Sequence, residues 1–252
     1  PDWYRIGLPV ETQTFEIVKP PSVAGVGGGV LPFAVLWNLT DVLFPTGQTT
    51  PPPAQTIPYE DWDWRASWSS AVQPGGPGVS KLRPIEHLRV LYRPNDLGQL
   101  ASDSDALLPI GVFESLALPG ESYKLAFTPG LLADVHGRGA VSFIPTPPGS
   151  LLGAIGPDKG GYVDLDGNGN WWVPSGRTFY HPTTGVLPQI ELAEATSHFF
   201  VPRRIRDPFR NEAVVTYHGG YDLLVNDTKD AVGNTVVAAN DYRVLQPNLI
   251  TD

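Results

Sequence analysis

Cysteine and methionine are both missing from the 252 residues of this chain. Without cysteine the chain has no disulfide bonds, thiolate nucleophiles or thiolate zinc ligands, so packing and hydrogen bonds must stabilise it. An intact translation product begins with methionine, whereas this chain begins Pro1-Asp2-Trp3-Tyr4 and stops at Ile250-Thr251-Asp252. We therefore expect a fragment of a longer protein, truncated at its C-terminus.

Basic residues and long apolar runs are also scarce. The 17 lysines and arginines are outnumbered by 26 aspartates and glutamates, which gives a formal net charge of -9. Nucleic acids and anionic membranes would repel such a chain. No apolar run approaches the roughly 18 residues of a membrane-spanning helix, and residues 1–10 lack the basic start and apolar stretch of a signal peptide. We expect no nucleic-acid partner and no membrane insertion by this segment.

Glycine and proline are abundant, with 27 of each. Both residues interrupt long helices and favour short strands joined by turns. Hydrophobic residues make up 41% of the chain and charged residues 17%, so the chain can bury a core and is expected to fold. The composition predicts an all-β protein with long Pro/Gly-rich loops and at most one or two short helices.

Two segments in the first part of the chain have β-forming residues. Residues 3–18 are rich in them and predict a strand. Residues 81–93 fit two structures, because their leucines and isoleucine have helical spacing whereas Val90-Leu91-Tyr92 is typical of a strand. The sequence leaves this second segment open.

Two segments further along give more definite predictions. Thr128 followed by Pro129 is the chemistry of an N-cap and a first helical turn, which predicts a short helix over 129–135. Within residues 162–182, a strand that begins at Trp171 is followed by the turn Pro174-Ser175-Gly176 and a second strand, which predicts a β-hairpin.

A long insertion loop is predicted at about residues 45–79, where proline and glycine are frequent and periodicity is weak. Trp62, Trp64 and Trp68 lie in it beside acidic residues. These rings could stack on sugars, or they could bury their surface and hold the loop against the body of the protein. A carbohydrate-binding or cell-surface-binding β-module is therefore an alternative function for the chain.

One acidic segment has part of the pattern of a calcium-binding loop. Oxygen-bearing side chains alternate with other residues at Asp164, Asp166, Asn168 and Asn170. The acidic residue that should complete the loop is missing, because Trp172 and Ser175 occupy its expected places. The same residues could instead form a turn in which aspartate and asparagine accept hydrogen bonds from nearby amides.

Other clusters suggest no catalysis. The chain has no Gly-x-Ser-x-Gly motif, and acids such as Glu60 and Asp61 on a proline-rich loop are usually solvated. We expect no enzymatic activity. Arg203, Arg204 and Arg206 form the one basic cluster, which could meet an acidic partner or pair with acids on neighbouring strands.

The strongest pattern is a repeat in the last part of the chain. The run Asp207-Pro208-Phe209-Arg210-Asn211 recurs 23 residues later as Asp230-Ala231-Val232-Gly233-Asn234, and Asp252 stands where a third copy would begin. Each copy continues with a β-branched run and then a tyrosine-led segment: Val214-Val215-Thr216 and Tyr221-Asp222-Leu223-Leu224 in the first, Thr235-Val236-Val237 and Tyr242-Arg243-Val244-Leu245 in the second. Since one hairpin cannot bury its own apolar face, such units are expected to stack into a solenoid or a coiled sheet.

These repeats resemble a known family. The resemblance rests on Arg206–Tyr217, Asp230–Asn234, Asn240–Pro247 and Thr251-Asp252, which resemble the rearrangement-hotspot (RHS) or tyrosine-aspartate (YD) repeat proteins. More narrowly, they resemble the B component of bacterial Tc insecticidal toxin complexes. Gly7–Thr12 and Arg89–Arg93 are also similar to segments of that family, so the resemblance extends loosely over most of the chain.

The resemblance implies a secreted bacterial shell protein whose repeats wind into a hollow capsule. The capsule would enclose a toxic polypeptide and deliver it to an injection channel. Its partners would be the rest of the parent shell protein, other toxin-complex subunits and the enclosed polypeptide. The family's self-cleaving aspartate site would lie beyond Asp252, so the resemblance assigns no catalytic residue here.

The chain is accordingly divided into a β-rich shell region, 1–196, and two degenerate repeats, 197–252. The fold expected is a succession of β-hairpins in a curved sheet. Arg210 stands where the second copy has Gly233, and His218-Gly219-Gly220 interrupts the tyrosine spacing. Because a tight turn there favours glycine, we predict that the first turn is distorted.

Overall fold

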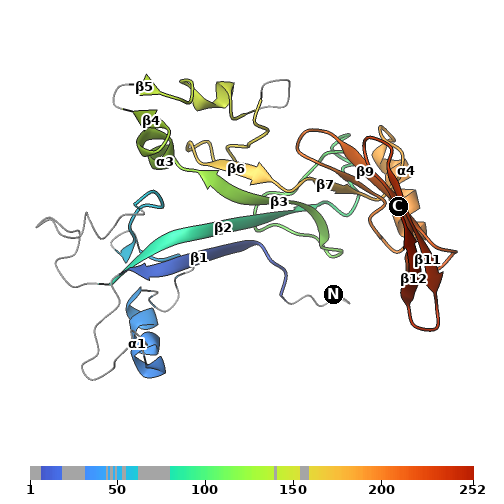
Figure 1. Cartoon of the computed structure of the whole chain (residues 1–252), viewed down its shortest axis with the longest axis horizontal. Helices are drawn as coiled ribbons and strands as arrows, with labels where there is room; N and C mark the ends of the chain where they lie inside the picture. Colours follow the sequence, from blue (N-terminus) through green and yellow to red (C-terminus); the bar gives the residue numbers. More distant parts are fainter. Residues whose placement is uncertain are drawn as a thin grey trace, which may run out of the picture.

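The computed structural model describes residues 7–18, 32–43, 45, 48, 50–52, 55–61, 80–138, 141–153 and 159–252. Their strands form a four-stranded sheet, a six-stranded sheet and a small two-stranded sheet, and every strand pair in them is antiparallel. The two larger sheets lie next to each other along the long axis of the molecule (Figure 1). The predicted all-β class is confirmed.

The four-stranded sheet has the order β1-β2-β3-β6. Its strands are β1 (Glu11–Val18), β2 (Lys81–Arg93), β3 (Leu118–Phe127) and β6 (Trp171–Pro174). The predicted strand over 3–18 is therefore confirmed from Glu11 onward, while residues 7–10 are not in a strand. The small sheet pairs β4 (Gly137–Arg138) with β5 (Val141–Ser142).

Strand β2 resolves the ambiguity over residues 81–93 in favour of a strand. Residues 81–89 pair with β1 on one edge and residues 88–93 pair with β3 on the other, so a neighbouring strand accompanies β2 along its whole length. Pro84 has no amide hydrogen to donate, and it lies at a bulge: Phe15 faces Pro84 and Thr14 faces Glu86, which leaves Ile85 as the extra residue. A proline at this position therefore costs the sheet little.

The six-stranded sheet has the order β12-β11-β10-β9-β8-β7, so each strand pairs with its neighbour in the chain. Its strands are β7 (Arg177–Phe179), β8 (Arg204–Arg206), β9 (Glu212–Tyr217), β10 (Val225–Lys229), β11 (Thr235–Asp241) and β12 (Gln246–Thr251). Helix α4 (Pro188–Ser197) lies between β7 and β8 in the chain, and the remaining connections are turns or short loops. Both copies of the repeat lie in this sheet.

The described residues contain three α-helices, α1 (Phe33–Leu43), α3 (Pro129–Asp134) and α4 (Pro188–Ser197), and a 3-10 helix at Pro148–Ser150. The prediction of at most one or two short helices was therefore wrong. None of the helices in this part of the chain is long and apolar enough to span a membrane.

Two of the helices show how proline abundance misled the helix prediction. Pro129 and Pro188 each start a helix at a position where proline needs no amide hydrogen, so proline here favours helices instead of breaking them. The predicted helix after Thr128 is confirmed, because the Thr128 hydroxyl accepts a hydrogen bond from the amide of Leu131 at 3.1 Å.

The predicted hairpin over residues 162–182 is wrong. Strand β6 pairs with β3 in one sheet, and β7 pairs with β8 in the other, so the turn at Ser175-Gly176 carries the chain between sheets. Gly176 has a φ of +102°, and a Cβ there would lie 2.6 Å from the Arg206 carbonyl oxygen. The turn signals were real, but each strand has a partner that is distant in sequence.

A small buried cluster lies where α4 meets the two sheets. Leu97, Leu118, Tyr180 and Ala195 form it, with Leu192 and Phe200 packed against it. The Tyr180 and Phe200 rings meet edge to face with centroids 5.9 Å apart. Because these residues come from β3, from the loop after β2, from the residue that follows β7, and from α4 and the loop after it, this cluster fixes the junction of the sheets.

Candidate functional site

The two repeated aspartate turns have the same hydrogen bonds. The Asp207 carboxylate accepts bonds from the amide two residues on and from that of Asn211, both at 2.8 Å, and from the Asn211 side chain at 2.9 Å. Asp230 accepts the equivalent bonds at 3.0, 2.9 and 2.8 Å, the last two from Asn234. Burial alone would raise the pKa of Asp230, but the bonds from Asn234 and the neighbouring amides hold this pKa below its usual value.

The first turn is not distorted, which corrects the prediction made from Arg210. Arg210 has a φ of +68° and Gly233 a φ of +97°, so both residues adopt the left-handed conformation. The Arg210 amide donates to the Asp207 carbonyl at 3.0 Å, and the Gly233 amide donates to the Asp230 carbonyl at 3.2 Å. The network of the turn therefore holds an arginine in a conformation that favours glycine.

The tyrosine-led segments lie at the opposite ends of the same strands, in the loops 218–224 and 242–245. The Tyr242 hydroxyl donates to the His218 carbonyl at 2.8 Å, and the rings of Tyr221 and Tyr242 meet edge to face at 6.3 Å. Asp222 binds His198, the C-cap residue of α4, at 2.7 Å, and Arg203, the residue before β8, at 3.0 Å, which fixes the first loop. Equivalent tyrosines of the two copies thus contact each other.

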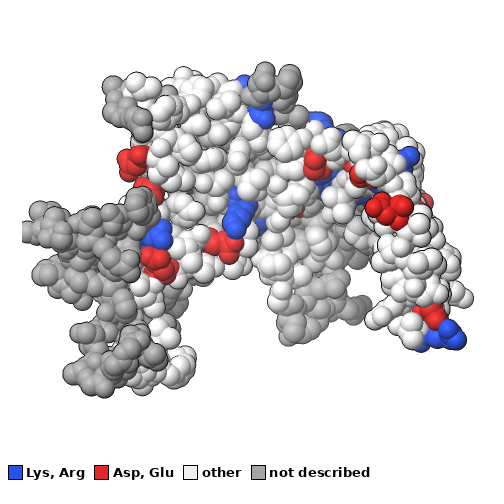
Figure 2. All heavy atoms as spheres, viewed as in Figure 1, with Lys and Arg blue, Asp and Glu red and all other residues white. Residues whose placement is uncertain are grey.

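The basic cluster before the first repeat pairs with acids of this chain. Arg203 binds Asp222, Arg204 binds Glu212 on the neighbouring strand β9, and Arg206 binds Asp105 at 2.7 Å. The interpretation of internal pairing is confirmed. Figure 2 likewise shows acidic and basic side chains next to each other on the face that it presents.

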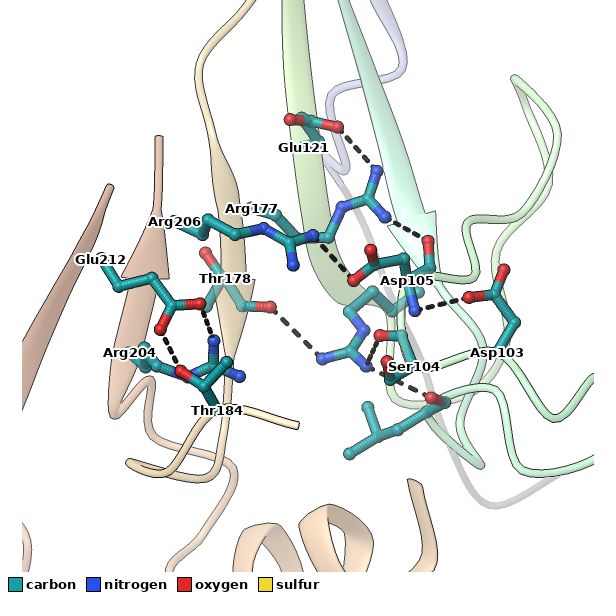
Figure 3. Close-up of polar contacts among 12 residues, drawn as sticks. Asp103, Ser104, Asp105, Glu121, Arg177, Thr178, Thr184, Arg204, Arg206 and Glu212 are labelled. Carbon is teal, nitrogen blue, oxygen red and sulfur yellow. Dashed lines mark hydrogen bonds and ion pairs between the residues drawn. The ribbon is translucent and has the colours of Figure 1, made fainter. Parts of the chain in front are cut away.

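Arginines from both sheets hold the loop that follows β2 (Figure 3). Arg177 of β7 donates to the Asp105 carbonyl, Arg206 of β8 binds the Asp105 carboxylate at 2.7 Å, and Arg93 donates to the Ser104 carbonyl at 3.0 Å. The loop is bound to the six-stranded sheet by Arg177 and Arg206 and to the four-stranded sheet by Arg93. This arginine junction therefore connects the two sheets through one short segment.

Phe179 of β7 lies at the centre of the arginine junction. The guanidinium carbons of Arg204, Arg206 and Arg93 lie 4.1, 4.8 and 5.3 Å from the centre of its ring. Phe179 is only 1% exposed, so these cation–π contacts are shielded from water. One aromatic ring thus packs against cations from β2 and β8.

A fully buried ion pair connects β2 to α4. Arg93 is 0% exposed and Glu191 is 1% exposed, and the two form a bidentate pair with N–O distances of 2.8 and 3.0 Å. Arg93 also donates to the carbonyls of Thr178 and Leu97, both at 3.2 Å. Glu191 accepts from the Tyr180 amide at 2.7 Å, and burial raises the pKa of the Tyr180 hydroxyl to about 12.

A groove of about 800 Å³ opens beside the arginine junction. It is lined by residues of β3, β6, β7, β8 and the first aspartate turn and by the segment before β6, among them Tyr162, Trp171, Arg206 and Arg210. Glu121 on its wall binds Arg177 at 2.8 Å and accepts the Tyr123 hydroxyl at 2.6 Å. Burial and the bond to Glu121 raise the pKa of Tyr123, so this hydroxyl stays protonated.

The proposed calcium ligands lie in a capped loop between Val163 and Trp172, which pair with each other. The Asp164 carboxylate accepts the amides of Asn168 and Gly169 at 3.1 and 3.0 Å, and the Asn168 side chain accepts the amide of Asn170 at 3.0 Å. Asp166 binds Arg89 of β2 at 2.7 Å. In the described part of the chain no group of three or more His, Cys, Asp or Glu is placed to hold a metal. The geometry favours the capped turn.

The other predicted binding residues, Trp62, Trp64 and Trp68, lie outside the described residues, as does most of the insertion loop at about 45–79. No pattern in the sequence indicates the Arg93–Glu191 pair or the Arg177–Glu121 pair. The partners are 98 and 56 residues apart. No local motif marks such pairs, because only the folded sheets bring them together.

No protein-family model matches the chain, and no curated protein matches it. Among solved structures, it is similar to a crystal structure of TcdB2-TccC3-TEV at 17% identity and a TM-score of 0.43, over 68% of this chain and 7% of that chain. It is also similar to a crystal structure of TcdB2-TccC3-Cdc42, at 18% identity and a TM-score of 0.44, over 68% of this chain and 7% of that chain. A structure of the Photorhabdus luminescens Tc holotoxin pore with a TccC3 mutation is similar at 17% identity and a TM-score of 0.43, over 75% of this chain and 8% of that chain. The chain thus spans less than a tenth of the length of these chains.

Proposed function

We propose that this chain is a non-catalytic wall segment of a secreted RHS/Tc-toxin-type capsule, which encloses a toxic polypeptide and delivers it. Its partners in this role are the rest of the parent shell, other toxin-complex subunits and the enclosed polypeptide. The proposal joins the resemblance of the repeats to the geometry that they adopt. In this role the chain has no activity separate from that of its parent protein.

The repeated aspartate turn is the observation that carries the proposal. Two turns with the same hydrogen bonds, at Asp207 and Asp230, connect β8 to β9 and β10 to β11 in one antiparallel sheet. A unit that regenerates the same turn and the same strand direction adds strands to a sheet without limit. This is the property that a wall of stacked hairpins requires.

The last strand, β12, is open for such an extension. It ends the strand order of the sheet and, among the described residues, pairs only with β11. Adjacent residues of a strand point to opposite faces, yet Leu249 is 61% exposed and Ile250 is 62% exposed. Apolar side chains on both faces of an open edge favour continuation of the sheet into further protein.

The ion pairs at the sheet junction support a structural role. Arg93 and Glu191 satisfy each other, and Glu121 and Asp105 are bound by Arg177 and Arg206. Charged groups held this way keep two sheets at a fixed angle, which suits a rigid wall.

Hydrogen–deuterium exchange tests the wall role. A longer chain that continues past Asp252 should slow the exchange of the β12 amides relative to this chain, because a further strand would pair with them. Amides of β8 and β9, which already have partners on both sides, should exchange alike in both. The proposal fails if the continuation lacks units of about 20–25 residues or if β12 exchanges equally fast in the two chains.

A protease-protection assay tests the enclosing role separately. In the intact parent protein, the enclosed polypeptide should resist a protease until the shell is unfolded. Digestion of that polypeptide in the native assembly would reject enclosure while leaving the wall geometry in place.

A further inference from the structure

We infer that a trough beside the first aspartate turn binds an extended peptide segment that carries an acidic side chain. The trough lies next to the arginine junction, away from the open edge at β12. It would bind its ligand whether or not the sheet continues past Asp252, so the inference goes beyond the wall role.

The shape of the trough suits an extended chain. The groove of about 800 Å³ is followed by a second hollow of about 440 Å³, and Arg206 and Arg210 line both. The first is lined by Trp171 and Tyr162, whereas the second reaches Thr184 and Ala231. Two adjoining hollows fit successive residues of an extended peptide better than one compact ligand.

The carboxylates that line the trough already have partners. Asp105 binds Arg206, Glu121 binds Arg177, Glu212 binds Arg204, and Asp164 and Asp207 accept backbone amides. Acids outnumber arginines on the lining, so the net charge of the trough does not attract an anion. An anion would instead be bound by individual hydrogen-bond donors that are still free.

Arg210 supplies those donors. Its guanidinium is exposed, and within the described residues its side chain forms no hydrogen bond or ion pair. Arg177 and Arg206, the other arginines of the lining, are both paired. A guanidinium binds a carboxylate through two parallel hydrogen bonds, so an acidic side chain is its natural partner.

The backbone of Arg210 gives independent support. The second copy forms the same turn with Gly233, so the turn itself does not need an arginine. A side chain in the left-handed conformation costs energy that glycine avoids. Strain of this kind at the rim of a groove points to a role for the side chain that bears it.

Two aromatic residues on the lining of the groove offer apolar contacts to the residues beside the acid. Trp171 and Tyr162 are half-buried and line the groove. A Cβ at Gly149 would lie 3.0 Å from Cη2 of Trp171, so glycine at this position leaves the indole its place. An aromatic or aliphatic neighbour of the acidic residue could pack on these rings.

Fluorescence anisotropy with labelled peptides tests the inference. The probe is a peptide of alternating glutamate and tyrosine, about ten residues long, with glutamine-tyrosine and lysine-tyrosine counterparts. The acidic peptide should bind this chain, and both counterparts should bind at least about fivefold more weakly. Arg210→Gly should weaken binding of the acidic peptide by about fivefold and should fold, because glycine suits the left-handed conformation.

Lys229→Gln is the matched control. Lys229 is exposed on β10 and removing it deletes the same charge outside the trough, so binding should not change. The inference is overturned if no peptide binds at about 1 mM, if the glutamine or lysine peptide binds as well as the acidic one, or if the two variants have equal effects. Binding of an acidic oligosaccharide such as oligogalacturonate, without binding of the acidic peptide, would also overturn it.

Discussion

Arg210 and Gly233 perform the same backbone task with different side chains. Both have positive φ at equivalent positions of equivalent turns. The left-handed conformation costs a residue with a Cβ roughly 1–2 kcal/mol, whereas glycine loses more entropy on folding. The two turns therefore differ in stability through one residue each, Arg210 in the first turn and Gly233 in the second.

Substitutions at these two positions should change the free energy of unfolding in opposite directions. Gly233→Ala should lower the free energy of unfolding by about 1 kcal/mol, and Arg210→Gly should raise it by up to about 1 kcal/mol. A Cβ at Gly233 would meet nothing within 4 Å, so backbone strain alone is measured. Urea denaturation gives both values.

Gly220→Ala is the control for this pair, since Gly220 lacks a positive φ and a Cβ there also meets nothing within 4 Å. It should be close to neutral. If Gly233→Ala proved as mild as Gly220→Ala, the conformation of the turn would not be the cause.

The error over the first turn shows where sequence reasoning stops at this scale. The spacing of Asp207 and Asn211 correctly predicted an aspartate turn, because the bonds that form it are local. Glycine at Gly233 suggested that arginine could not do the same. The three hydrogen bonds that the aspartate accepts hold the backbone in this conformation even when the residue is an arginine. A preference assigned to one residue does not include the combined effect of these bonds.

At the scale of elements, the Arg93–Glu191 pair fixes α4 against β2. Both side chains are buried, and together they contact carbonyls or amides of Leu97, Thr178 and Tyr180. Removing one partner leaves the other charge buried without compensation, which is far more costly than losing an exposed pair.

Glu191→Ala should therefore lower the free energy of unfolding by about 3–5 kcal/mol. The double variant Arg93→Met with Glu191→Leu should lose less than the sum of the single variants Arg93→Met and Glu191→Leu, because no buried charge remains. Chemical denaturation of the four proteins in this cycle provides the comparison.

Glu86→Ala is the exposed counterpart, since the Lys124–Glu86 pair has side chains 54% and 38% exposed. Its cost should stay within about 1 kcal/mol. Equal costs for Glu86→Ala and Glu191→Ala would contradict the role given to the buried pair.

Elements could be predicted from sequence where their cause is local. Thr128 with Pro129 defined the start of α3, and the β-formers of residues 11–18 defined β1. The predicted hairpin at Trp171 failed because β6 and β7 are each paired with a strand far away in sequence. The arginine junction was invisible for the same reason, as Arg206 and Asp105 are 101 residues apart.

At the scale of the whole molecule, the two ends of the six-stranded sheet differ. The end at β7 is covered by α4 and by the arginine junction, and Phe179 is 1% exposed. All six residues of β12 at the other end are exposed. The two edges of this sheet therefore differ in exposure, and in the wall role proposed above a further strand would pair with β12.

The open end should make the isolated chain self-associate. Among the residues that the structure describes, one edge of β12 has no partner strand, and Leu249 and Ile250 are exposed on this strand; such edges pair with other strands as concentration rises. Ile250→Lys places a charge on this edge and should shift the sedimentation velocity profile toward monomer at a given concentration. Leu100→Lys is the matched control, because Leu100 is 95% exposed but lies far from β12 in the chain and outside both sheets. If Leu100→Lys suppressed association as strongly as Ile250→Lys, general surface apolarity would be responsible. If the unaltered chain stayed monomeric at every concentration, the edge of β12 would not pair with other copies of the chain.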